Sequence, residues 1–158
     1  MLRYRLGLMP NRPIHIATST PAGAGYAFYK ANNQNDLSRL LETLGGAGGG
    51  YLGAILPDRI DPPFHPGHRS WGHGLGPVTA ATAVWNQKLD GCQDSLRQQA
   101  NYHAQLRTQS TDLLATAWHS VVELVLRLLS GFVAGIGAGY VTHVALDFGT
   151  PRCLPLIS

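Results

Sequence analysis

The sequence has few charged residues. Asp, Glu, Lys and Arg make up 13% of its 158 residues, whereas about a quarter is usual for a soluble globular protein. The surface therefore either relies on neutral polar groups or is covered by protein partners or a membrane. The net charge is +3 with His neutral, and the basic residues are scattered rather than gathered in a run. This charge pattern gives no specific signal for nucleic-acid binding.

Cysteine is also scarce. Cys92 and Cys153 are too few for a disulfide framework. We interpret both as free thiols, although a single bridge between them stays open, and so does the redox compartment. The first residues, MLRYRLGLMPNRP, contain no apolar stretch of signal-peptide length before Pro10. We therefore expect no secretory signal.

No segment shows the alternation of apolar and polar residues that is typical of strands. Apolar residues instead recur at helical spacing, as in the run of leucines after Asp36. The sequence predicts an all-α fold, a compact multi-helix bundle with Gly/Pro-rich loops, and a single domain over residues 1–158.

Glycine and proline are expected to interrupt the helices. A first helix should start near Ile14 and be kinked or interrupted at Pro21, and Asp36 should cap a second helix. The glycines of 45–50 either end that helix or let it pack closely on a neighbour. From Pro57 to His68 the prolines predict a loop. The later segments are a helix over 77–88, a polar surface helix or mobile insertion over 89–112, and a helical region over 113–148.

The segment Leu128–Leu146 contains no charged residue and is long enough to cross a bilayer. Three glycines at a spacing of four line one face, as in membrane helix pairs: Gly131, Gly135 and Gly139. The alternative is a buried central helix of a soluble bundle. Charged or metal-binding residues lie at both ends of the segment, namely Glu123, Arg127, His143 and Asp147. They favour a soluble or peripheral protein over an integral one.

A first cluster of metal-ligand residues lies in the proline-rich loop: Asp58, Asp61, His65, His68 and His73. Carboxylates and imidazoles in a rigid loop are good ligands for zinc and similar metals. His68 and His73 are five residues apart, so they could converge only where a loop runs into a helix start. The alternative interpretation, a polar turn with solvent-facing histidines, explains the loop equally well.

A second cluster is formed by His143 and Asp147, which lie four residues apart and so share one helical face. Together they could bind one ion, and the carboxylate could bridge two. By themselves they are explained more simply as a buried His–Asp hydrogen bond. His15 reads as an ordinary residue of a helix start, His103 as a surface residue and His119 as a packed helical residue.

With these residues placed, the chain resembles the YdjM-like family of inner-membrane-associated, metal-dependent hydrolases. That family is similar in fold to zinc-dependent phospholipases C and fungal single-strand nucleases. Three stretches carry the resemblance: Ile14–Ala17, the Pro-Asp and His-Arg…His pattern over 53–73, and the Gly-Tyr…His…Asp…Thr-Pro pattern over 139–151.

The resemblance implies a mostly helical fold and a centre of one to three ions, zinc or another divalent metal. In the phospholipase relatives, a His-x-x-x-Asp pair supplies ligands to two ions, and the Asp bridges them. The resemblance also implies a cytoplasmic or inner-membrane-associated protein. The residues that it would use as metal ligands are His15, Asp58, His68, His73, His143 and Asp147.

Our first hypothesis is therefore a metal-dependent hydrolase with a phosphoester substrate. Asp58 or Asp61 could accept a proton from water, and Arg69 could stabilise the anionic transition state. The chain departs from the family at Gly72 and Gly74, where relatives usually carry Thr and Ser. The second hypothesis is accordingly a structural or interaction protein that keeps the fold without turnover, since related sequences are also carried by phages and prophages. Protein partners, a homo-oligomer or peripheral membrane contact would then cover its surface.

Overall fold

The computed structural model describes residues 12–60 and 75–148, without the side chains of 75–82 and 84–86. Four helices fill these ranges: α1 (Arg12–Lys30), α2 (Asp36–Ile60), α3 (Leu75–Gln109) and α4 (Leu113–Phe148). The described residues form a compact all-α bundle, as the sequence predicted.

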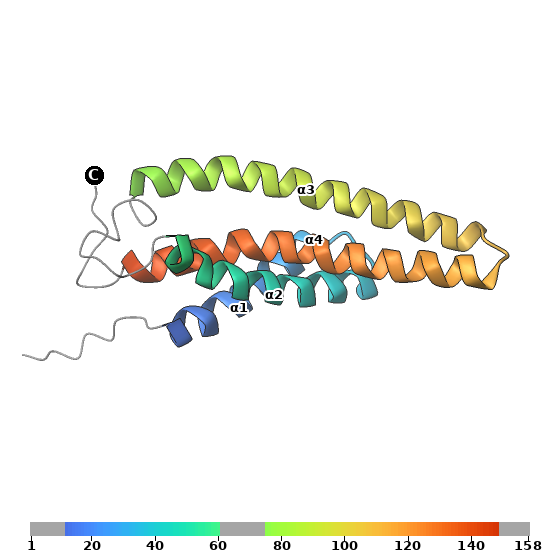
Figure 1. Cartoon of the computed structure of the whole chain (residues 1–158), viewed down its shortest axis with the longest axis horizontal. Coiled ribbons are helices and arrows are strands. Elements are labelled where there is room, and N and C mark those ends of the chain that lie inside the picture. The colour runs from blue at the N-terminus through green and yellow to red at the C-terminus, as the bar shows by residue number, and fades with distance from the viewer. Residues whose placement is uncertain (1–11, 61–74, 149–158) are drawn as a thin grey trace, which may run out of the picture.

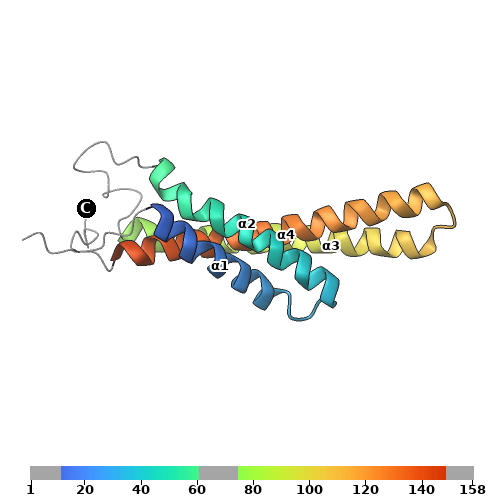
Figure 2. The ribbon, with the colours of Figure 1, turned by 90° about the horizontal axis from the view of Figure 1, so that it is seen from below.

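Helix α4 lies in the middle of the bundle (Figure 1). It contacts all three other helices, with α3 along one side and α2 and α1 on the other. Helix α2 runs parallel to α4, whereas α1 and α3 run antiparallel to it. The start of α1 and the ends of α2 and α4 therefore meet at one end of the molecule. At the opposite end, the α3–α4 hairpin extends beyond the α1–α2 hairpin (Figure 2).

Glycines bring α2 and α4 into direct backbone contact. A Cβ atom added at Gly49 would overlap the carbonyl oxygen of Phe132, and one added at Gly131 would overlap that of Glu42. Gly135 and Gly139 face the backbones of Gly46 and Gly50 in the same way. Of the two alternatives for the glycine run, close packing is thus correct, and α2 continues through it without a break.

The predicted interruption at Pro21 and the predicted loop start at Pro57 are wrong, while a kink at Pro21 stays a prediction. Helix α1 continues through Pro21, which lies on its exposed side. There the carbonyl that loses its helical donor can turn toward water. Helix α2 continues through Pro57 to Ile60, although a loop was predicted from Pro57 onward. As a result, Asp58 belongs to the last turns of α2.

The predicted helix over 77–88 and the polar segment over 89–112 belong to one helix, α3, up to Gln109. The segment is thus helical as far as Gln109, as the surface-helix interpretation predicts. The predicted bounds of the last helix, 113–148, agree with α4. The cap of α2 is Asn35 rather than Asp36, because Asn35 Oδ1 accepts a hydrogen bond from the N–H of Ser38 (2.9 Å).

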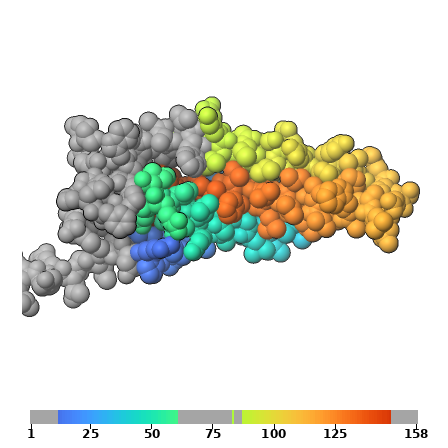
Figure 3. Space-filling model, in the orientation of Figure 1, coloured from blue at the N-terminus to red at the C-terminus, as the bar shows by residue number. Residues whose placement is uncertain are grey.

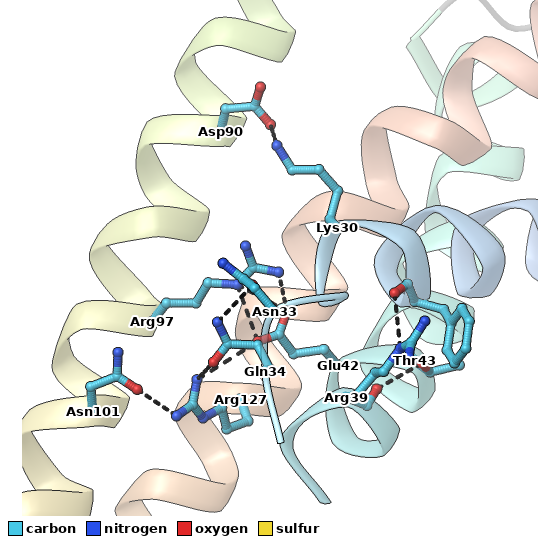
Figure 4. Close-up of polar contacts among 11 residues, drawn as sticks. Lys30, Asn33, Gln34, Arg39, Glu42, Thr43, Asp90, Arg97, Asn101 and Arg127 are labelled. Atoms are coloured by element: carbon cyan, nitrogen blue, oxygen red, sulfur yellow. Dashed lines mark hydrogen bonds and ion pairs between the residues drawn. The ribbon is translucent and has the colours of Figure 1, made fainter. Parts of the chain in front are cut away.

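A buried polar network joins α3 to the other helices (Figure 4). Glu42 of α2 is fully buried and accepts hydrogen bonds from Arg97 of α3. Arg127 of α4 lies beside Glu42 and donates to Gln34 (2.7 Å) and to Asn101 of α3 (2.6 Å). Burial lowers the pKa of Arg127, although Glu42 and Glu123 oppose that shift.

Among the described helices, α4 is the one that is long and apolar enough to cross a membrane, over Leu113–Asp147. Its charged residues Glu123, Arg127 and Asp147 are all buried. Its outer surface is apolar and shows between α3 and α2 (Figure 3). The exposed apolar side chains of α4 include Leu114, Trp118, Val121, Val125 and Leu129. The expectation of a soluble or peripheral protein stays a prediction.

Candidate metal centre

The antiparallel packing of α1 and α4 brings together residues from the two ends of the chain. His15 lies in the first turn of α1, and His143 and Asp147 lie in the last two turns of α4. All three are buried, with exposed fractions of 4%, 0% and 3%. A buried cluster of ionisable side chains is costly unless its members interact with one another or with an ion.

Asp147 lies between the two histidines. Its Oδ1 is 3.3 Å from Nε2 of His15, and its Oδ2 is 3.4 Å from Nε2 of His143. The imidazole rings stack with their centroids 3.8 Å apart and their planes inclined by 15°. Each carboxylate oxygen therefore faces one ring nitrogen.

The backbone of α2 orients the second histidine. Nδ1 of His143 lies 2.5 Å from the carbonyl oxygen of Ala54. Because a carbonyl can only accept, Nδ1 must carry the proton and donate it. In the neutral ring this leaves the lone pair on Nε2, the atom that faces Asp147. A backbone carbonyl that holds the second nitrogen of a histidine in this way is common around metal-binding histidines.

The pKa values of the His–Asp pair move apart. Burial by itself would lower the pKa of His143, but the interactions with Asp147, Ala54 and Asp58 outweigh it and raise that pKa. For Asp147, burial acts to raise the pKa, whereas hydrogen bonds from His143 and His15 lower it well below its usual range. Without an ion, the pair is therefore stabilised as imidazolium and carboxylate.

Asp58 lies beside this group at the end of α2. Its Oδ1 is 3.6 Å from Nε2 of His143, and its side chain is 41% exposed. A partly solvent-exposed carboxylate thus lies next to the buried triad.

The buried group could hold a single metal ion. The ligand atoms of His15, His143 and Asp147 all lie within 4.8 Å of one another. Two imidazoles and one carboxylate form a set that zinc uses in catalytic sites, where a fourth position stays open. The same three residues also form a His–Asp–His bridge between α1 and α4 without any ion.

Four other predicted residues lie outside the described part of the chain: Asp61, His68, Arg69 and His73. Their roles stay predictions. Two features had no signal in the sequence. The carbonyl of Ala54 is a backbone atom and leaves no trace in composition. His103, predicted to be a surface residue, and His119, predicted to be a packed helical residue, lie against each other with their Nδ1 atoms 3.0 Å apart.

No family model, no curated protein and no solved structure matches this chain. The resemblance to the YdjM-like family and to the phospholipase C fold therefore stays a prediction. Over residues 12–60 and 75–148, the chain forms an all-α bundle of four helices with a buried His15–His143–Asp147 triad.

Proposed function

We propose that this protein is a metal-dependent hydrolase that cleaves phosphoester bonds with a metal-activated water. The observation that carries the proposal is the buried triad of His15, His143 and Asp147, with the partly exposed Asp58 beside it. Zinc and similar ions favour this donor set.

We assign the buried residues to metal binding and the partly exposed Asp58 to proton transfer. The triad would hold a divalent ion, which supplies Lewis-acid polarisation of a phosphoryl oxygen and acidifies water. Asp58, within reach of both solvent and His143, would accept the proton of the attacking water. Asp61 is the alternative base, Arg69 would stabilise the anionic transition state, and His68 and His73 would complete the ligand set.

Metal analysis of purified protein tests this proposal most directly. Protein supplied with zinc or manganese should retain the ion and hydrolyse a phosphodiester such as bis-p-nitrophenyl phosphate. Asp147→Ala should lose both the ion at the triad and the hydrolysis. Asp90→Ala is a matched control, because it removes a carboxylate that pairs with Lys30 far from the triad. Wild-type protein that stays metal-free under both supplies would refute the proposal.

A structural role is the second candidate. The His15–Asp147–His143 contacts join α1 to α4 without an ion, so the triad could serve as a polar clamp. In that case the metal-free protein would be fully folded and no phosphoester would be hydrolysed. The apolar outer surface of α4 would then be the functional feature, as a site of peripheral contact with a membrane.

A further inference from the structure

A second pair of histidines lies at the opposite end of the molecule. His103 of α3 and His119 of α4 face each other between the two helices of the α3–α4 hairpin. Both side chains are half-buried. His119 precedes His143 by 24 residues on the same helix, which places the pair about 36 Å from the triad. The two groups of histidines are therefore independent.

The separation of the ring nitrogens suits a shared ion. Nδ1 of His103 and Nδ1 of His119 are 3.0 Å apart, with ring centroids at 5.1 Å and planes inclined by 48°. Two imidazole nitrogens that bind one metal at about 2.0–2.1 Å lie roughly 2.9–3.4 Å apart for bond angles between square and tetrahedral. A single N–H···N hydrogen bond explains the same distance, so the geometry alone allows both states.

An ion pair and an aromatic ring border the two histidines. One turn further along each helix, Arg107 of α3 and Glu123 of α4 form an ion pair of 3.5 Å. The Tyr102 ring approaches His103 edge-on, with centroids 5.8 Å apart. No third His, Cys, Asp or Glu of the described residues completes a compact set here, so water would supply the remaining ligands.

We propose that His103 and His119 form a metal site of their own, which takes a divalent transition-metal ion such as zinc or copper. Neutral imidazoles are good ligands for both ions, and copper binds tightest in the divalent series. The ion would join α3 to α4 where, among the described helices, α3 packs along α4 alone. A link between residues 16 apart would close the tip of the hairpin.

The test compares two paired substitutions. The first variant is His103→Gln/His119→Gln, and the second is His15→Gln/His143→Gln. Both are titrated with zinc and with copper beside wild-type protein. Far-UV circular dichroism checks that each protein is folded. We expect the first variant to bind one zinc equivalent less than wild type and to lose copper EPR couplings from two histidine nitrogens. The second variant should keep those couplings. Unchanged zinc stoichiometry and copper spectra in His103→Gln/His119→Gln would overturn the proposal.

A distance measurement keeps the proposal testable if the first variant does not fold. Cys92 is an exposed thiol on α3, 11 residues before His103, or about 16 Å along the helix. A nitroxide on Cys92, with Cys153 replaced by Ser, should be strongly relaxed by copper bound at the histidine pair. A label that copper does not affect in the His15→Gln/His143→Gln background would overturn the proposal without bearing on the triad.

Discussion

Glu42 and Arg97 form a two-point ion pair inside the bundle, and it joins two helices whose backbones do not touch. Nε of Arg97 lies 3.1 Å from Oε1 and 3.0 Å from Oε2 of Glu42, and an Nη2 contact to Oε2 completes the fork. The Glu42 side chain is fully buried, and Arg97 is 12% exposed. Because Arg127 also faces Glu42, one carboxylate compensates two cations.

Glu42→Gln should therefore be strongly destabilising. The substitution removes the carboxylate that faces both Arg97 and Arg127 inside the bundle, which costs about 3–5 kcal/mol of unfolding free energy. Urea unfolding measures the loss. Asp90→Asn is the matched control, because the partly exposed Lys30–Asp90 pair should contribute only about 0–1 kcal/mol. Equal stability losses in the two variants would contradict the central role of Glu42.

The glycine contacts between α2 and α4 predict that the effect of a Gly→Ala substitution on stability depends strongly on its position. Gly49→Ala and Gly135→Ala would drive a methyl group into the backbone of the facing helix, at a cost of about 1–3 kcal/mol or more. Gly91→Ala meets no atom within 4 Å, so it should stabilise α3 by about 0.5–1 kcal/mol. Thermal unfolding of the three variants checks this order. A destabilised Gly91→Ala would contradict it.

The stability of the metal-free protein should depend on pH through the His143–Asp147 pair. The pKa of Asp147 is lowered, so its contribution is present above the ordinary value of about 4 and is lost as the pH falls through the lowered pKa. The pKa of His143 is raised, so its contribution is complete below the ordinary value of about 6.5 and is lost as the pH rises through the raised pKa. The pair therefore contributes most between about pH 4 and 6.5.

His143→Gln supplies the measurement of that pH dependence. With a chelator present, the stability difference between wild type and variant should be largest near pH 5.5 and should shrink toward pH 8.5. Urea unfolding at several pH values gives this difference directly. A difference that grows with pH would mean that the pair is not held as imidazolium and carboxylate.

The exposed apolar residues of α4 should bind a membrane surface. Because the chain carries a net charge of +3, wild-type protein should sediment with anionic phosphatidylglycerol vesicles. Leu114→Gln/Trp118→Gln, at positions 79% and 63% exposed, should weaken that binding at least several-fold. Tyr102→Gln on α3, at 58% exposed, is the control and should bind as wild type does. Wild-type protein that stays in the supernatant would count against peripheral membrane contact.

Local patterns in the sequence were sufficient for part of this structure. The apolar run of 113–148 has no helix breaker other than glycine, and its helix has the predicted bounds. The spacing of His143 and Asp147 predicts that both lie on one face of that helix. In the structure, Nε2 of His143 and Oδ2 of Asp147 are 3.4 Å apart. Local rules failed at Pro21 and Pro57, because the penalty of a proline depends on what surrounds the carbonyl that it leaves without a donor.

Local sequence patterns were enough to predict the helical class, the bounds of α4 and the pairing of His143 with Asp147, since each depends on residues within a few turns of one another. Which distant groups meet depends on how the helices pack. The antiparallel packing of α1 and α4 brought His15 to Asp147, and the glycine contacts brought the Ala54 carbonyl to His143. The same packing paired Glu42 with Arg97 and His103 with His119. Such contacts depend on helix direction and crossing, which no local spacing encodes.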